Sequence, residues 1–152
     1  MNLLSFARYV GIFNRQTQAY ITAAFSSMNI SFSEYILLMN LYNHEGINQE
    51  DISSILFIDK AAIARSIKSL EEKGYISREV AIEDRRSKKL FLTDLAKKDE
   101  KYLYSILERW ENYTTEGLDI VTKDQIFKGL ETMAEKSASI NLSDVSKYER
   151  RK

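Results

Sequence analysis

Basic side chains gather in the stretch 59–93, and their types and spacing suit contacts with phosphate groups and with the edges of nucleic-acid bases. Lys60, Arg65 and Lys68 are spaced among alanines, and small residues between cations allow a helix to approach a groove lined with phosphates. A guanidinium can also donate two hydrogen bonds to one guanine. The residues expected on this exposed side are Lys60, Ala61, Ala62, Ala64, Arg65 and Lys68.

A second basic group lies in the run AIEDRRSKK, residues 81–89. Its cations are Arg85, Arg86, Lys88 and Lys89, and its anions are Glu83 and Asp84. The flanking runs 75–80 and 89–93 have strand character, so the basic group is predicted to form the loop of a hairpin. A charged turn in solvent is the simpler interpretation. The position directly after a cation-bearing helix favours a winged helix-turn-helix.

The cation-bearing helix is predicted to begin at Asp59, whose side chain can accept hydrogen bonds from free backbone N–H groups. It is predicted to end at Gly74, because glycine tolerates the left-handed conformation that often follows a helix. Ile63, Ile67 and Leu70 recur at intervals of four and three residues and therefore share one face. That face is expected to point into a core and to leave the cations exposed.

Helical patterns also precede this stretch. Residues 3–24 have the apolar spacing of one long amphipathic helix. Ser31 and Glu34 have the spacing of a capping box, and the helix that they start should end near Gly46. Asn48 is expected to cap a short helix. The residues expected on the buried side of that short helix are Ile52, Ile55 and Leu56.

Two further helices are predicted after Thr93. The first should end near Gly117, and Thr122 with Gln125 has the spacing of a second capping box before the last helix. The apolar stripe expected on that last helix is Ile126, Leu130, Met133 and Ala134. Because long terminal stripes need a partner, we expect a homodimer built by the regions 1–28 and 94–145. The alternative is that they cover the central unit of a monomer.

Composition excludes several kinds of site. The chain has 152 residues, a formal net charge of +0, no cysteine and one histidine, so we expect a single subunit over 1–152. Thiol chemistry, cysteine-bound zinc and a His-rich metal site within one protomer are excluded, and His44 is expected to be solvated. No Gly-rich phosphate loop and no paired carboxylates stand out, so we expect no enzyme, no metal and no cofactor.

The sequence also bears on location. No apolar run approaches the roughly 20 residues that cross a membrane. The N-terminal residues MNLLSFARYVGIF include no basic leader and no clear cleavage site. We therefore expect a cytoplasmic protein without a membrane partner.

In the order of its elements the chain resembles the MarR family of winged helix-turn-helix transcriptional regulators. ISFSEYILLMNLYNHEGINQEDIS is similar to the family's first two core helices, and IDKAAIARSIKSLEEKGYISRE to its recognition helix and first wing strand. EDRRSKKLFLTDLA is similar to the wing motif, with Ala96 where many members have glycine. The resemblance implies a mainly α fold with a small β wing. The winged helix-turn-helix, 31–93, would be flanked by N- and C-terminal dimerisation helices.

The resemblance also implies site residues. Lys60, Ala61, Ala62, Ala64, Arg65 and Lys68 would face the major groove of double-stranded DNA or its phosphates. Arg86, oriented by Asp84, would enter the minor groove, and Arg85 could take that role instead; Lys88 lies beside them. Family members often have hydroxyl residues where Ala61, Ala62 and Ala64 stand, which leaves Arg65 as the best candidate for a base contact.

The function implied is a dimeric, sequence-specific repressor of transcription that binds a pseudo-palindromic operator. A small aromatic or anionic effector is implied as a partner. Candidate residues for its pocket are Tyr9, Phe13, Arg15, Tyr20, Tyr35 and Trp110, and the simpler interpretation is that most of them belong to the core or to the dimer interface. The alternative function is a winged-helix protein-interaction module that binds no DNA.

Overall fold

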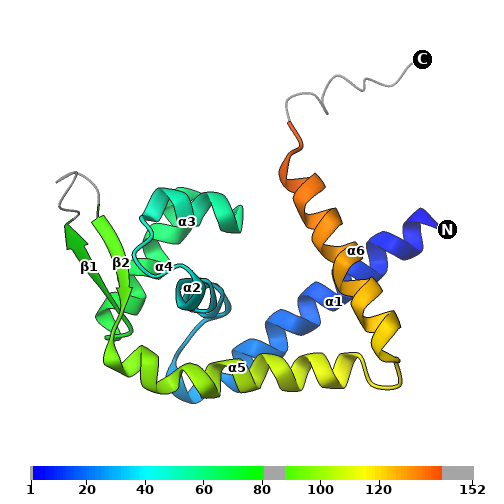
Figure 1. Cartoon of the computed structure of the whole chain (residues 1–152), viewed down its shortest axis with the longest axis horizontal. Coiled ribbons are helices and arrows are strands. Elements are labelled where there is room, and N and C mark those ends of the chain that lie inside the picture. Colours follow the sequence, from blue (N-terminus) through cyan, green and yellow to red (C-terminus); the bar gives the residue numbers. More distant parts are fainter. Residues whose placement is uncertain (1, 81–87, 142–152) are drawn as a thin grey trace. The chain divides into compact units, whose positions relative to one another are not determined.

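The computed structural model describes residues 2–80 and 88–141. In chain order its elements are α1 (Leu3–Ala24), the short 3-10 helix η1 (Ser26–Met28), α2 (Phe32–Asn43), α3 (Gln49–Leu56), α4 (Lys60–Glu72), β1 (Ile76–Val80), β2 (Lys88–Leu92), α5 (Asp94–Thr114) and α6 (Ile120–Ala138) (Figure 1). Contacts divide the chain into two units, Met1–Thr114 and Thr115–Lys152, which are described separately. The prediction of a mainly α fold with a small β wing is confirmed.

The predicted caps of α4 and α2 are confirmed. The Asp59 side chain accepts a hydrogen bond from the Ala62 backbone N–H at 2.8 Å. Gly74, which follows α4, has a φ of +77°, in the left-handed region that favours glycine. Ser31 and Glu34 form the reciprocal capping box at the start of α2. Hydrogen bonds local in sequence therefore determine where these two helices begin.

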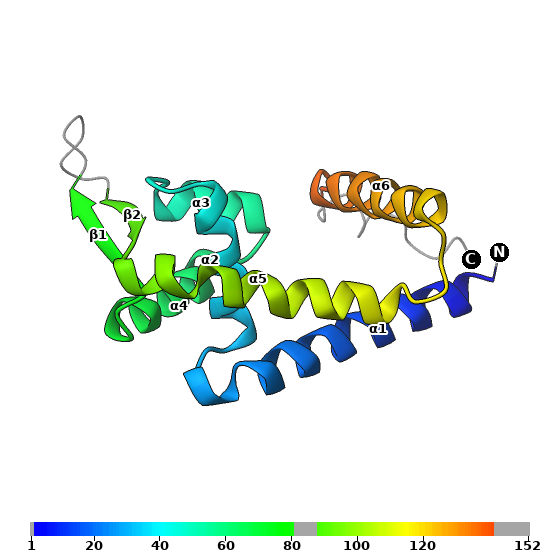
Figure 2. The same ribbon diagram turned by 60° about the horizontal axis from the view of Figure 1, so that its bottom comes forward.

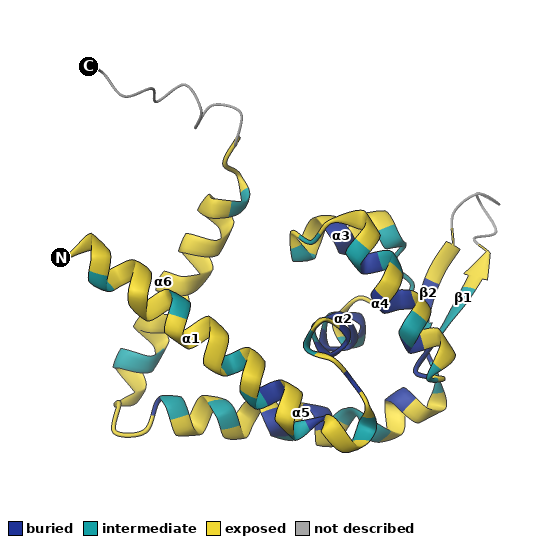
Figure 3. Cartoon of the chain, turned by 180° about the vertical axis from the view of Figure 1, so that it is seen from behind, coloured by how far each residue is buried: buried dark blue, intermediate teal, exposed yellow. Residues whose placement is uncertain are grey.

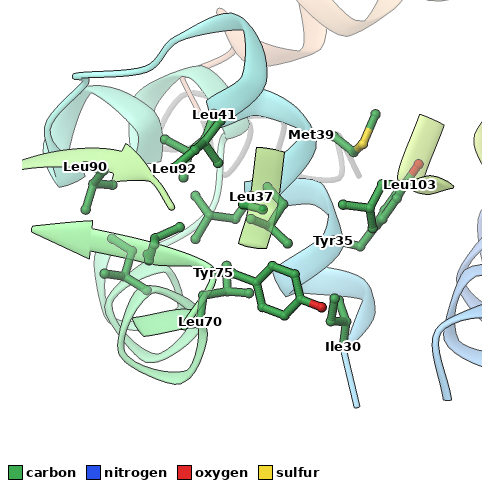
Figure 4. Close-up of a cluster of buried hydrophobic side chains, with 14 of the residues drawn as sticks. Ile30, Tyr35, Leu37, Met39, Leu41, Leu70, Tyr75, Leu90, Leu92 and Leu103 are labelled. Carbon is green, nitrogen blue, oxygen red and sulfur yellow. The ribbon is translucent and has the colours of Figure 1, made fainter. Parts of the chain in front are cut away.

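A buried apolar cluster holds the elements of the first unit together. Leu37, Leu38 and Leu41 of α2 are fully buried, as are Ile67 and Leu70 of α4. Figure 4 shows side chains of α2 between those of the hairpin and of α5; those labelled there include Leu37, Leu41, Leu70, Tyr75, Leu90, Leu92 and Leu103. The core fixes α4 against α2 through one face only, because the buried residues of α4 lie at helical spacing.

The two strands pair in an antiparallel hairpin. Ile76 lies opposite Leu92 at one end and Val80 lies opposite Lys88 at the other. The observed strands differ by one residue at most from the predicted runs 75–80 and 89–93 at each end. The wing predicted from the sequence is therefore confirmed over its strands.

The long helices α1 and α5 pack together in the first unit. The Trp110 ring on α5 stacks on Tyr20 of α1 with 4.8 Å between ring centroids, and its indole N–H donates to Thr17 Oγ1 at 3.0 Å. In Figure 2 α1 and α5 are drawn as neighbouring long helices. Most of α1 N-terminal to Ile21 is exposed (Figure 3). Within the described ranges no helix is long and apolar enough to cross a membrane.

The expected position of Ile55 is wrong. Ile55 was expected on the buried side of α3, but its side chain is 46% exposed. Ser53 is buried in its place, because its hydroxyl donates to the Ile58 carbonyl at 2.6 Å in the turn between α3 and α4. The buried residues of α3 are therefore Ile52 and Ser53, and Ile52 is the one apolar residue among them.

The second unit contains α6, and its predicted cap is also wrong. Asp119, and not Thr122, is the N-cap, because its side chain precedes the helix and accepts from the Thr122 backbone N–H at 2.9 Å. That hydrogen bond holds the pKa of Asp119 below its ordinary value. The expected stripe is present in the helix, but Ile126, Leu130 and Met133 are all exposed. No residue of α6 is buried.

Candidate nucleic-acid interface

Helix α4 combines a buried apolar face with an exposed basic face. Ile63 and Ile67 anchor the inner face in the core. Ala61, Arg65 and Lys68 fall at intervals of four and three residues on the outer face, and all three are exposed. The packing that holds α4 therefore also determines which of its side chains face solvent.

The structure separates the predicted contact residues of α4 into two groups. Lys60, Ala61, Arg65 and Lys68 are exposed, whereas Ala62 and Ala64 are half-buried at the edges of the outer face. Ala62 and Ala64 therefore present less surface than the sequence suggested. The exposed face offers one guanidinium and two ammonium groups beside a methyl group.

Carboxylates partner two of the three cations on this face. Lys60 pairs with Glu50 of α3, and Lys68 Nζ lies 3.8 Å from Glu72 Oε1. Arg65 has no ion-pair partner within the described ranges. Among the described residues, its guanidinium is therefore the cation of α4 that has no ion pair to lose before it donates to a ligand.

Glu50 belongs to this site as the partner of Lys60, and the sequence patterns did not predict it. The hydrogen bond and the charge of Lys60 lower the pKa of Glu50, so the carboxylate is ionised at neutral pH. Glu50 lies ten positions before Lys60, across the turn between two helices. No periodic pattern links them; only the crossing of α3 and α4 brings them together.

The wing is attached directly to the turn that precedes α3. The Gly46 backbone N–H donates to the Leu90 carbonyl at 2.8 Å, and the Leu90 N–H donates to the Ile47 carbonyl at 2.8 Å. The Glu45 carboxylate accepts from the Leu92 N–H at 3.0 Å and pairs with Lys97 at 3.2 Å. These contacts couple β2 to the helix-turn-helix on one side and to α5 on the other.

The predicted wing residues are only partly described. Lys88 is exposed at the start of β2, opposite Val80. Asp84, Arg85 and Arg86 lie outside the described residues. Their predicted contacts therefore remain predictions.

A partly buried ion pair fixes the C-terminal end of α4. Lys73 Nζ lies 2.7 Å from Glu34 Oε1 and also donates to the Asn29 carbonyl. Burial alone would raise the pKa of Glu34, but Lys73 and hydrogen bonds from Ser31 and Ser69 outweigh burial and lower it. The pair links the start of α2 to the end of α4 and restrains the orientation of α4.

The candidate pocket residues do not form one group. Phe13, Tyr20 and Trp110 lie together, with the Phe13 and Trp110 ring centroids 6.2 Å apart. Tyr9 and Arg15 are exposed on α1, whereas Tyr35 is buried in the core, where its ring stacks on Phe25. Of the six candidates, Phe13, Tyr20 and Trp110 are therefore the ones that the structure brings together, at the contact of α1 with α5.

The described residues define a class of protein. Two short helices joined by a tight turn, the second with an exposed basic face, are followed directly by a two-stranded hairpin. This arrangement is a winged helix-turn-helix. Among the residues that the structure describes, no group of His, Cys, Asp or Glu is placed to hold a metal ion.

Comparison with known proteins defines the family. A model of the MarR family matches residues 28–87. A MarR transcriptional regulator from Methanosarcina mazei Go1 is 33% identical and superposes with a TM-score of 0.84 over 90% of this chain and 98% of that chain. The chain belongs to the MarR family of winged helix-turn-helix transcriptional regulators, so it is a regulator and not an enzyme.

Two further proteins are similar to this chain, one in sequence and one in fold. The HTH-type transcriptional regulator YybA of Bacillus subtilis (strain 168) is 29% identical over 109 residues, which cover 72% of this chain and 70% of YybA. A MarR family regulator from Listeria monocytogenes, solved in complex with 26mer DNA, has the same fold. It has a TM-score of 0.85 and 23% identity over 96% of this chain and 97% of that chain.

Proposed function

We propose that the chain acts as a homodimeric repressor that binds a pseudo-palindromic operator, with α4 of each copy in one major-groove half-site. The observation that carries this proposal is the outer face of α4, where Arg65 is exposed and free of ion pairs within the described residues. A free guanidinium beside the small side chain of Ala61 suits bidentate contact with guanine. The Listeria monocytogenes regulator, which has this fold, was solved in complex with 26mer DNA.

In the same proposal the wing reads the minor groove. Arg86, oriented by Asp84, enters it, and Arg85 is the alternative. A guanidinium is favoured in a narrow minor groove because the negative potential is strongest there. Lys88, exposed at the start of β2, adds a phosphate contact.

Selection of bound sequences from random double-stranded DNA tests this proposal. We expect a site with two related half-sites about one helical turn apart. Arg65→Ala should weaken binding to that site about 10- to 100-fold and relax the preference at one base pair per half-site. Arg109→Ala removes an exposed arginine from α5 and is the matched control. Absence of salt-sensitive binding by the wild-type protein would instead favour the protein-interaction module.

The direction of regulation needs a separate experiment. With the selected operator placed over a reporter promoter, the wild-type protein should lower expression, and the double variant Arg65→Ala, Arg86→Ala should not. Increased expression with the wild-type protein would identify an activator.

We propose a small aromatic or anionic effector near Phe13, Tyr20 and Trp110. Tyr20 stacks on Trp110 and Phe13 is tilted against it, so the three rings offer an apolar surface to an aromatic ligand. Arg15 is exposed on the other side of α1 and is not placed to pair with an acid bound at these rings. Because Trp110 is the chain's one tryptophan, its fluorescence would report occupancy directly. Benzoate is a suitable probe. A true effector must also release the operator, because a ligand that binds the DNA-competent and the DNA-incompetent conformations equally well does not change the equilibrium between them.

A further inference from the structure

The N-terminal turns of α3 and α4 meet at one exposed point. Glu50 in the first turn of α3 pairs with Lys60, the first residue of α4, and both side chains are about 70% exposed. The Gln49 amide also donates to the Lys60 carbonyl at 3.5 Å. This contact lies at the end of α4 that a helix-turn-helix inserts into the major groove.

The charge at that end is unusual for a surface that approaches DNA. Two carboxylates, Asp59 and Glu50, accompany the single ammonium of Lys60. Asp59 has a structural task, because it caps α4 through the Ala62 N–H. The Glu50 side chain has no hydrogen-bond or ion-pair partner but Lys60 within the described ranges. Negative phosphates repel a carboxylate, so Glu50 should lower the affinity of this surface for DNA. Such repulsion can itself serve a function.

We propose that Glu50 determines specificity by occupying Lys60 and thereby weakening sequence-independent attachment to DNA, an inference that rests on the proposed function. Non-specific binding depends on cations that follow the phosphate backbone. When Lys60 joins such a set it either leaves Glu50 unpaired or holds the carboxylate close to the phosphate, and both arrangements place a negative charge beside the backbone. In the operator complex Arg65 holds the helix by base contacts, and the Lys60 pair can stay intact. Glu50 therefore lowers the affinity for non-specific DNA more than the affinity for the operator.

Salt dependence distinguishes this role from a general effect of charge. Each lysine that neutralises a phosphate adds about 0.9 to the slope of log affinity against log salt concentration. In the wild-type protein Lys60 adds little, because breaking its pair with Glu50 offsets its attraction to a phosphate. Glu50→Gln should therefore steepen the slope by about 0.9 for non-specific DNA.

A purely structural role for Glu50 is also testable. A carboxylate in the first turn stabilises its own helix through the helix dipole, whatever residue stands at position 60. Such a role would change the stability of α3 and would not depend on Lys60. The two roles therefore separate in a double-mutant cycle with Lys60→Met.

The experiment measures binding to two 26-base-pair duplexes, the selected operator and a scrambled sequence of the same composition, at several salt concentrations. Glu50→Gln should raise affinity for the scrambled duplex about two- to fivefold and affinity for the operator less, so the specificity ratio falls. In the Lys60→Met background the same substitution should no longer steepen the salt slope, and any gain that comes from removing the unpaired carboxylate should be equal for the two duplexes. Circular dichroism melting of each variant confirms that it is folded.

Asp124→Asn in α6 is the matched charge control, since it removes one carboxylate from an exposed pair with Lys128. Three results would each overturn the inference: equal increases in affinity from Asp124→Asn, equal increases for both duplexes when Lys60 is present, or a fall in the specificity ratio that persists without Lys60. If Glu50→Gln changes nothing while the wild-type protein binds its operator, this inference fails and the proposed function stands. If the wild-type protein binds neither duplex, both fail.

Discussion

The Tyr35 hydroxyl shows what one unpaired polar atom does inside the core. Tyr35 is 1% exposed, and its hydroxyl is the one buried side-chain N or O atom without a hydrogen-bond partner within the described ranges. Burial, with a smaller effect of Tyr104, raises the pKa of Tyr35 to about 12. The phenol is therefore neutral at pH 7, and the cost of its position is the loss of hydrogen bonds to water.

Replacement of that hydroxyl should make the protein more stable. Tyr35→Phe keeps the stacked ring and removes the unpaired group, so the free energy of unfolding should rise by about 1 kcal/mol in urea denaturation. Tyr75→Phe is the control, because the Tyr75 hydroxyl donates to Asp99 at 3.0 Å, and it should lower the free energy of unfolding by about 1 kcal/mol. Equal destabilisation by the two substitutions would show that Tyr35 has a partner in solution.

Phe57 carries a second local cost. It ends α3 with a φ of +53°, a left-handed conformation that side chains with a Cβ rarely adopt, and its side chain is 68% exposed. Phe57→Gly should relieve the strain with little loss of packing and raise the free energy of unfolding by about 0.5–1 kcal/mol. Phe57→Ala keeps the Cβ and should show no such increase. An increase with alanine as well would point to the exposed ring as the source of instability.

At the scale of elements, the Glu34–Lys73 pair makes the attachment of α4 depend on pH. The folded-state pKa of Glu34 lies below its ordinary value of 4.5. A carboxyl group with a lowered folded pKa stabilises the protein above its unfolded pKa, and that stabilisation is lost as the pH falls through the folded pKa. The contribution of Glu34 should be complete at neutral pH and should disappear in acid.

Glu34→Gln should therefore lower the free energy of unfolding by about 2 kcal/mol at pH 7, because Lys73 loses its charged acceptor. The difference from the wild-type protein should shrink as the pH falls below about 4.5, where the unfolded carboxyl group is protonated. Glu72→Gln is the control; its pair with Lys68 is exposed, so the loss should stay below about 0.5 kcal/mol. A Glu34→Gln difference that is constant from pH 7 to pH 3 would contradict the assignment.

The same elements show what the sequence could predict. The caps Asp59 and Ser31 were predicted correctly, because neighbouring residues determine them, and the strand ends were predicted to within one residue. The equally local cap of α6 was assigned to Thr122 instead of Asp119. Features that depend on packing were missed. Ile55 is exposed because the Ser53 hydroxyl takes the inner position. Glu50 meets Lys60 only through the packing of two helices, so no spacing in the sequence could reveal that Lys60 has a partner.

At the scale of the whole molecule, each of the two units has an exposed apolar surface. Leu3, Leu4 and Val10 of α1 are exposed in the first unit. Phe127, Leu130 and Met133 are exposed on α6 in the second, and α6 has no buried residue. Amphipathic helices of this kind gain their stability from packing against a partner. We propose that the partner is a second copy, which would also supply the second reading helix that a pseudo-palindromic operator requires.

Leu130→Glu tests the dimer, because Leu130 lies at the centre of the apolar stripe of α6, and a charge there would be buried on association. In sedimentation experiments at micromolar concentration the variant should dissociate at least about tenfold more readily than the wild-type protein. Thr132→Glu adds the same charge on the opposite face of α6 and should remain dimeric. Because the two half-sites are bound by linked helices, the monomeric variant should also bind the full operator no better than a single half-site. If Leu130→Glu dimerises as tightly as the wild-type protein, the dimer interface lies elsewhere. If the variant stays dimeric but no longer binds the operator, the α6 surface contributes to DNA binding and not to dimerisation.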